Sequence, residues 1–473
     1  MLFNSYIFIV FFIIVYTLYL LLNSNYKVQN IILLTASYIF YGYWDWRFTL
    51  LLALSTIVDF TVGKFLQNSQ SERKRKTLLF ISIFFNLSVL GFFKYFNFFA
   101  ESFAGLFQVF GLEANWVTLN VLLPVGISFY TFQTMSYTID VYKRNLQPIN
   151  NFLDFALFVS FFPQLVAGPI ERATTLIPQI ISPRQVKLEQ VNAGINLIIW
   201  GYFKKVVIAD NMASIANSVF NDYTQYQGLD ILIGILAFTI QIYGDFSGYS
   251  DIARGLSKLM GFELMLNFKL PYFAISPSDF WSRWHISLST WLRDYLYIPL
   301  GGNRGGTLNT YRNLFLTMLL GGLWHGAAWN FVIWGAFHGL ILIFYRIFDK
   351  KPKHSNSKSA KSSYLLPLSK MLLMFILTNI GWVIFRSSSI NQIYYMLANV
   401  GFSLSEKSLN WGYDLVFFCL PLFLVQIYQY VTRDLLILTK LKPIVRVSIY
   451  SFLIIWICVF GVRESGEFIY FQF

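Results

Sequence analysis

Residues 314–345, LFLTMLLGGLWHGAAWNFVIWGAFHGLILIFY, decide the fold class of this chain. They contain no Asp, Glu, Lys or Arg, and their only side chains that titrate near neutral pH are His325 and His338. A single straight helix of this length would measure about 48 Å, which is longer than the ~30 Å hydrocarbon core of a bilayer. Five glycines also interrupt the run. We therefore predict two membrane elements that are broken or sharply tilted within residues 321–330.

The whole chain has the composition of a membrane protein. Of its 473 residues, 56% are hydrophobic, 19% are aromatic and only 12% are charged, whereas soluble domains carry about 25% charged residues. This composition excludes a water-soluble multidomain enzyme, a disordered chain and a secreted disulfide scaffold. The net charge of +13 is assigned to loops that face anionic lipid rather than to nucleic-acid binding. Cys419 and Cys458 lie in apolar runs, so we predict that both are buried small hydrophobes.

Apolar runs recur along the chain at lengths that fit membrane helices. We predict an all-α, polytopic integral membrane protein with about eleven membrane segments, together with re-entrant or interfacial helices. No pair of matching halves, which many transporters show, is visible in the sequence. The expected segments lie near residues 6–22, 29–43, 48–65, 78–96, 119–141, 152–166, 191–209, 229–243, 314–345, 365–385, 413–430 and 445–462.

Basic residues set the expected orientation in the membrane. The first strong basic cluster is RKRK at residues 73–76, and the positive-inside rule places it in the cytoplasm. Three expected crossings precede it, so we predict that the N-terminus lies outside. No basic region or cleavage site accompanies the first apolar run, which we expect to be retained as a spanning helix. The lysine-rich residues 349–370 are typical of a cytoplasmic basic loop.

Residues 245–304 contain no clean apolar run, so this segment is expected at the interface or dipping in under a cover of protein or water. Within it, Ser276 and Pro277 mark a helix start, and the glycines after Pro299 mark its end. Read as one helix, the stretch carries two apolar stripes, and His285 falls on one of them. Two interpretations stay open: an amphipathic interfacial helix anchored by tryptophans, or a helix that carries His285 into a cavity.

His325 is the stronger functional candidate. A histidine at membrane depth is costly unless it is paired or hydrated, so it marks a functional site by default. Imidazole takes up and returns a proton near pH 7, as a general base requires. The alternative is a structural histidine bonded to a neighbouring carbonyl, which is our interpretation of His338. The sequence contains no nucleophile elbow, Walker loop or His-Glu-x-x-His motif, and no set of residues with metal-ligand spacing.

Acidic residues also enter the apolar body of the chain. Asp245 and Asp251 follow a predicted spanning run, and Arg254 is close enough in sequence to pair with either of them. One interpretation is a structural ion pair at a helix end, and the other is a polar wall of the same cavity. Asp59, with Asp140 and Asp210, is predicted to lie near a segment end and to support the fold.

Several longer motifs carry a family resemblance. The motifs are FFPQLVAGPI (161–170), DFSGYSD (245–251), PYF (271–273), DFWSRWHIS (279–287), WLRDY (291–295), PLGG (299–302) and GLWHG (322–326). In these motifs the sequence resembles the membrane-bound O-acyltransferase family, in particular the branch of alginate O-acetyltransferase membrane subunits, which is related to the D-alanyl transferase of teichoic acid assembly. The resemblance covers almost the whole chain.

The resemblance implies a ring of membrane helices around a central funnel. It implies one transmembrane acyltransferase domain over residues 1–473, with a histidine-bearing core at about 229–345. His325 matches the essential histidine of the family, and His285 matches the second family histidine. As substrate-binding residues we expect Trp324, Arg293, Asp294, Asp245, Tyr249 and Arg283, without assigning a cofactor-binding residue.

The implied reaction moves an acetyl or other acyl group from a cytoplasmic thioester, either acetyl-coenzyme A or an acyl carrier thioester, across the membrane. His325 would act as general base, while His285 would orient groups or stabilise an oxyanion. The acceptor would be a cell-surface polysaccharide such as alginate, reached directly or through an extracytoplasmic acetyltransferase partner. We expect a multi-pass protein of the cytoplasmic membrane that contacts lipids, with no permanently bound cofactor, no metal and no nucleic-acid partner.

Other functions remain open from the sequence. The same chain could transfer D-alanyl or another acyl group to a cell-wall polymer. It could be a transporter without chemistry, although matching halves are missing. It could also be a membrane scaffold that recruits a soluble acetyltransferase, in which case histidine variants would keep their function.

Overall fold

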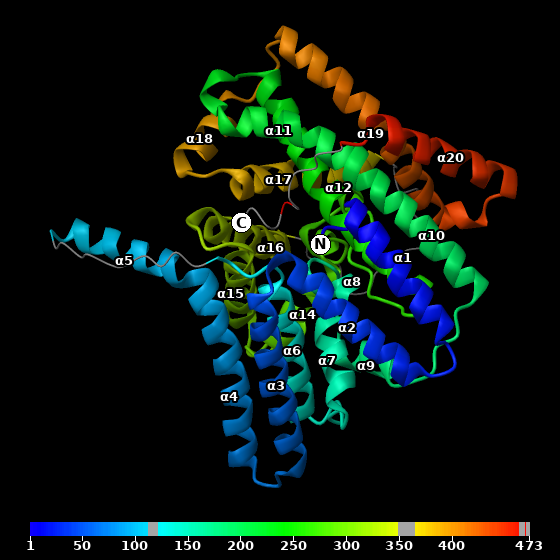
Figure 1. Ribbon diagram of the computed structural model, residues 1–473. Helices are drawn as coiled ribbons and strands as arrows, with labels where there is room; N and C mark the ends of the chain where they lie inside the picture. Colours follow the sequence, from blue (N-terminus) through cyan, green and yellow to red (C-terminus); the bar gives the residue numbers. More distant parts are fainter. Residues whose placement is uncertain (112–121, 349–364, 463–468, 470–473) are drawn as a thin grey trace, which may run out of the picture. The chain divides into compact units, whose positions relative to one another are not determined.

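The computed structural model describes residues 1–111, 122–348, 365–462 and 469, and Figure 1 shows them as helices joined by connecting segments. Within these ranges no strand forms, and the one β-type contact is an isolated bridge between Gly228 and Val400. The chain divides into two compact units. The first contains Met1–Ile198 and Tyr249–Met265, and the second contains Ile199–Gly248 and Leu266–Phe473.

The first unit is built around α3, α4 and α6, which pack on one another. In Figure 1, α3 and α4 run side by side, and α5 points away from them. The helices that lie within this unit are α1 (Tyr6–Leu21), α2 (Tyr26–Asp45), α3 (Arg47–Asn68), α4 (Glu72–Leu90), α5 (Phe96–Val109), α6 (Ile127–Tyr142), α7 (Phe152–Ser160), α8 (Phe162–Leu165) and α9 (Ala173–Ile180).

A buried polar network joins α3 to α4. Asp59 lies in the middle of α3, so the prediction that it marks a segment end is wrong. Its carboxylate oxygens accept hydrogen bonds from the hydroxyl of Ser82 at 2.5 Å and from the amide of Asn86 at 2.9 Å. A buried carboxyl group is tolerated only when hydrogen bonds replace its lost hydration. Side chains of the neighbouring helix α4 therefore supply the hydrogen bonds that the buried carboxyl group of Asp59 requires.

Arg75 belongs to the basic cluster, yet it is buried rather than exposed. Its guanidinium group donates hydrogen bonds to the backbone carbonyls of Leu66, Val141 and Tyr142. These carbonyls lie at the last turns of α3 and α6, where no helical N–H is available to them. Arg75 thus links the ends of α3 and α6 by hydrogen bonds, in addition to any contribution of the cluster to the orientation of the chain in the membrane.

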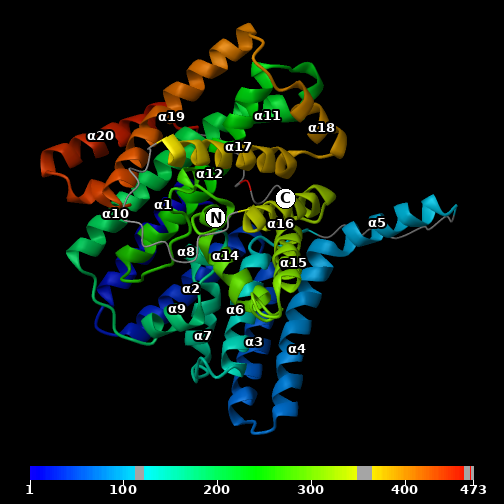
Figure 2. The same ribbon diagram turned by 180° about the vertical axis from the view of Figure 1, so that it is seen from behind.

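The second unit carries the histidines. Figure 2 shows α15, α16 and α17 close together, and α16 packs on both of the others. Two helices, α10 (Leu188–Tyr202) and α12 (Leu229–Leu259), contain two of the three boundaries between the units, and the third lies between Met265 and Leu266. The other helices of this unit are α11 (Asp210–Asn221), α13 (Pro277–Trp281), α14 (Ile286–Leu292), α15 (Thr307–His325), α16 (Trp329–Phe348), α17 (Leu365–Arg386), α18 (Ile390–Asn399), α19 (Glu406–Thr432) and α20 (Pro443–Phe460).

The break predicted within residues 321–330 is present, because α15 ends at His325 and α16 begins at Trp329. The two helices then run antiparallel with their backbones almost touching. A Cβ atom added to Gly322 would lie 2.3 Å from the carbonyl oxygen of Phe331, and one added to Gly335 would lie 2.4 Å from that of Met318. Only glycine permits this approach, which resembles the small-residue interfaces of membrane helices.

The prediction of one helix from Ser276 to Pro299 is wrong. The start is as predicted, since the Ser276 hydroxyl accepts a hydrogen bond from the N–H of Asp279. However, α13 stops after five residues, and α14 begins after a left-handed residue, His285, with φ of +42°. The intervening backbone pairs instead with a distant segment: Lys269 N–H donates to Arg283 O, and Ile286 N–H donates to Asn267 O. The predicted apolar stripes therefore do not exist.

Among the described residues, seven helical segments are long and apolar enough to cross a membrane, so the count of eleven is not confirmed. Hydropathy alone counts helices such as α6, which is buried on nearly every side and does not reach the length of a span. Residues 349–364 of the predicted basic loop lie outside the described residues. Cys419 is buried as predicted, but Cys458 is exposed. The candidate spans are Arg47–Asn68, Glu72–Val109, Leu229–Leu259, Trp329–Phe348, Leu366–Arg386, Glu406–Thr432 and Pro443–Phe460.

Candidate active site

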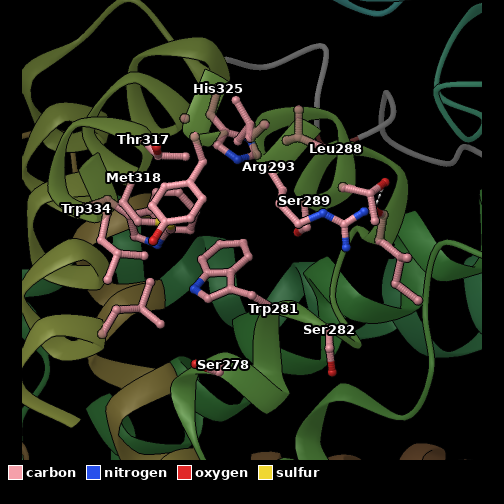
Figure 3. Close-up of a pocket in the computed structure, with 17 residues that line it drawn as sticks. Ser278, Trp281, Ser282, Leu288, Ser289, Arg293, Thr317, Met318, His325 and Trp334 are labelled. Carbon is pink, nitrogen blue, oxygen red and sulfur yellow. Dashed lines mark hydrogen bonds between the residues drawn. The ribbon is translucent and has the colours of Figure 1, made fainter. Parts of the chain in front are cut away.

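A cavity of about 500 Å³ lies in the second unit, between α13, α14, the π-helical turn Arg293–Tyr297, α15 and α16. Figure 3 shows the side chains of His325, Arg293, Trp281 and Met318 surrounding a common space. Most of its walls are apolar, and the polar groups are few. Small-molecule sites in proteins have this size and this mixture of apolar walls and isolated polar groups.

His325 is the residue that the end of α15 delivers to the cavity. Its side chain lines the space and is 5% exposed. Aromatic rings meet the imidazole edge to face: Trp324 with ring centroids 5.1 Å apart, Trp334 at 5.0 Å and Phe385 at 5.5 Å. These rings restrict the orientation of the imidazole while leaving it at the cavity wall. The imidazole of His325 is thereby held at the cavity wall.

His285 lies at the start of α14 and is fully buried, but it is not part of the cavity wall. Its Nδ1 lies 3.2 Å from Oδ1 of Asn267, and its ring packs against Phe246 at 4.7 Å and Trp324 at 6.0 Å. Trp324 therefore contacts both histidine rings. Burial lowers the pKa of His285 to about 3, so its imidazole is neutral at physiological pH.

The two arginines that were predicted to bind substrate differ in their position relative to the cavity. Arg293 lines the cavity, and its Nε donates to Asp294 at 2.7 Å. Arg283 lies outside the cavity wall, and its Nε donates to Asp279 at 2.7 Å. Asp294 acts here as the partner of Arg293 rather than as a wall residue. Of this group, Arg293 alone is in a position to meet a ligand in the cavity.

Asp245 lies in α12 and is buried in an ion pair. Lys205 sits 2.8 Å from Asp245 and 2.8 Å from Asp210, and the second oxygen of Asp245 accepts the N–H of Ile469 at 2.7 Å. Asp245 thus pairs with Lys205, a residue that the sequence analysis did not single out, and not with Arg254 at a helix end as one interpretation expected. Asp245 is not among the residues that line the cavity, and its role toward substrate stays a prediction.

Two further predicted residues belong to the first unit. Tyr249 is buried and stacks on Phe3, with ring centroids 4.4 Å apart. Asp251 pairs with Arg254 at 3.4 Å, as their spacing predicted. Within the parts of the chain that the structure describes, no group of three His, Cys, Asp or Glu side chains is arranged to hold a metal ion. The substrate-binding role of Tyr249 stays a prediction.

Sequence reasoning missed two kinds of residue. Trp281 and Ser289 line the cavity, but the single-helix interpretation did not separate them from their neighbours. Asn267 contacts His285 from 18 positions away. One feature of the sequence could have pointed to Asn267: its polar amide side chain stands between two apolar residues, Leu266 and Phe268.

Comparison with known proteins decides the family. The family model of the membrane-bound O-acyltransferase family matches residues 38–385. The chain belongs to the membrane-bound O-acyltransferase family. It is therefore an O-acyltransferase, and the apolar spans together with the family membership make it a multi-pass membrane protein.

Relatives within this O-acyltransferase family are similar over most of their length. The chain is 43% identical to a probable alginate O-acetylase of Pseudomonas aeruginosa over 87% of this chain and 76% of the relative. It is 37% identical to a peptidoglycan O-acetyltransferase of Helicobacter pylori over 77% and 72%. It is 29% identical to a teichoic acid D-alanyltransferase of Streptococcus thermophilus over 59% and 71%.

Proposed function

We propose that this O-acyltransferase acetylates hydroxyl groups of a cell-surface polysaccharide, with His325 as its general base. The observation that carries the proposal is the position of His325 in the wall of an apolar cavity that also contains Arg293. The similarity to an alginate O-acetylase and to a peptidoglycan O-acetyltransferase supports a glycan as acceptor.

The reaction follows from the chemistry of a thioester and an imidazole. A lone pair on His325 takes the proton of the attacking hydroxyl group, and the hydroxyl oxygen forms a bond to the acyl carbon. The carbon–sulfur bond then breaks, and the departing thiolate takes the proton from His325. The products are an O-acetyl ester and a free thiol, so the imidazole is returned to its neutral state after each turnover.

The donor is proposed to be acetyl-coenzyme A or an acyl carrier thioester that arrives from the cytoplasm. A cavity of about 500 Å³ is much larger than an acetyl group, so it has room for part of the arm that carries the sulfur. The guanidinium group of Arg293 is the charged donor in this wall. It suits a carbonyl or phosphate oxygen of the arriving thioester.

The acceptor side is proposed to face away from the cytoplasm. The acetyl group would reach the polysaccharide directly or through an extracytoplasmic acetyltransferase partner. This arrangement implies a place in the cytoplasmic membrane with the N-terminus outside, in keeping with the basic cluster at residues 73–76.

Purified protein in proteoliposomes tests the proposal. Acetyl-coenzyme A labelled in the acetyl group is supplied on one side and an alginate oligosaccharide on the other. We expect label on the oligosaccharide together with one free thiol for each ester formed. Release of no thiol, with a solute recovered chemically unchanged, would favour a transporter. Transfer of D-alanine from a carrier thioester, with no transfer of acetate, would favour the D-alanyl reaction.

Arg293→Ala is expected to raise the KM for the thioester donor roughly ten-fold or more, because a hydrogen bond from a charged group is lost. Arg283→Ala is the matched control, since it removes a guanidinium group nearby in sequence that pairs with Asp279 outside the cavity wall. Donor titrations in the proteoliposome assay measure both values. Equal increases in the two variants would contradict the assignment of Arg293.

A further inference from the structure

The side-chain oxygen of Asn267 lies within hydrogen-bond distance of atoms from two residues, Ser287 and His285. Its Oδ1 lies 3.2 Å from the backbone nitrogen of Ser287, 2.9 Å from the Ser287 hydroxyl and 3.2 Å from Nδ1 of His285. A backbone N–H group can only donate. The atom that receives it must therefore be the amide oxygen of Asn267, which fixes the orientation of the amide group.

The state of His285 follows from that orientation. An amide oxygen can only accept, so the Nδ1 that faces it must carry a proton. In a neutral imidazole one nitrogen carries the proton and the other carries a lone pair. A hydrogen bond donated by the first nitrogen therefore determines that the second nitrogen is unprotonated. We propose that Asn267 is a positioning residue that holds His285 as its Nδ1–H tautomer, with Nε2 as a hydrogen-bond acceptor.

The surroundings of the pair make this assignment stable. Asn267 and His285 are both fully buried, and the rings of Phe246 and Phe268 pack nearby, with centroids 5.0 Å apart. The backbone carbonyl of Asn267 also accepts the N–H of Ile286. Asn267 thus holds the left-handed turn at His285 through its backbone and the imidazole through its side chain.

The inference refines the role of His285 in the proposed function. A neutral imidazole whose Nε2 carries the lone pair cannot donate a hydrogen bond from that atom. His285 is thereby excluded as a donor to a developing oxyanion, which is one of the two roles that its family motif left open. Its Nε2 can instead only accept a hydrogen bond, so the role left for it is to orient a group that donates one.

The tautomer is measured in the full-length protein in lipid bilayers by nitrogen-15 NMR of labelled histidines. The chain has only four histidines, and a His285→Gln variant assigns the relevant pair of signals. We expect Nδ1 of His285 to show the signal of a protonated nitrogen and Nε2 that of an unprotonated one. The reverse pattern, or two protonated nitrogens, would overturn the inference.

Variants of Asn267 connect the tautomer to the reaction. Asn267→Leu removes the acceptor at nearly constant volume, so we expect loss of the single tautomer and a fall in kcat of about 10-fold or more. Asn267→Asp keeps an acceptor oxygen in either protonation state, so the tautomer and most of the activity should be retained. If the leucine variant keeps both the tautomer and the kcat of the wild type, the inference is wrong.

A control separates positioning from general destabilisation. Asn313 in α15 is also fully buried, and its amide donates to the carbonyl of Gly302. Asn313→Leu should lower thermal stability without altering the signals of His285, and an equal change in those signals would contradict the inference. The expected fall in kcat of Asn267→Leu rests on the proposed function. The tautomer of His285 in the wild type, in contrast, is measured by NMR without any substrate. The reverse tautomer in an active enzyme would therefore defeat this inference alone.

Discussion

His325→Ala is expected to reduce acetyl transfer by on the order of 10²–10⁴-fold, the usual contribution of a general base. His325 is the imidazole in the cavity wall, and nothing in an alanine side chain replaces its proton-accepting nitrogen. Membrane insertion and yield should stay normal because the change is confined to the end of α15. The thiol-release assay in proteoliposomes gives the rate, and size-exclusion chromatography in detergent checks the fold.

His354→Ala is the matched control for this variant. It changes the same residue type in the polar, lysine-rich stretch at residues 349–370 and should leave the rate unchanged. Acetyl transfer at the wild-type rate in His325→Ala would defeat the assignment of the general base. It would leave the family membership intact and direct attention to a scaffold that recruits another enzyme.

Gly322→Ala is expected to destabilise the second unit by about 3 kcal/mol or more, at the upper end of what overpacking costs. The added methyl group would lie 2.3 Å from the carbonyl oxygen of Phe331 and 2.9 Å from Cα of Gly335. Both are backbone atoms, so α15 and α16 must separate to make room. Since both helices line the cavity, we also expect acetyl transfer to fall sharply. Thermal unfolding in detergent measures the stability.

The adjacent glycine supplies the control. A methyl group at Gly321 would meet only the end of the Leu292 side chain, at 3.0 Å, and a side chain can move by a few tenths of an ångström. Gly321→Ala should therefore lose much less stability than Gly322→Ala. Similar losses in the two variants would show that the contact between the helix backbones does not control the stability of this unit.

The sequence predicted those features that depend on local chemistry. The length of residues 314–345 and their glycines predicted the break between α15 and α16. The serine and proline at 276 and 277 predicted the start of α13. His325, which the sequence singled out as a histidine in an apolar, glycine-flanked stretch, lines the cavity, while its catalytic role stays a prediction.

Features that depend on distant contacts could not be predicted in the same way. The turn at His285 exists because its backbone pairs with residues 267–269, and no local propensity signals a left-handed histidine. The contact between Asn267 and His285 could not be predicted for the same reason, since the two residues are 18 positions apart in the sequence. Hydropathy also could not distinguish a helix that faces lipid from one enclosed by protein, and α6 was counted as a span for this reason.

The glycine contact between α15 and α16 fixes the spacing of these two helices beside the cavity. Their backbones already touch, so a broader acyl group cannot be accommodated by replacing the contact glycines. Space must come instead from large side chains in the wall, such as Met318 and Leu342 on α15 and α16 or Trp281 and Leu288 on α13 and α14. Directed evolution toward longer donors should therefore accumulate its changes at such side chains and leave the glycines untouched.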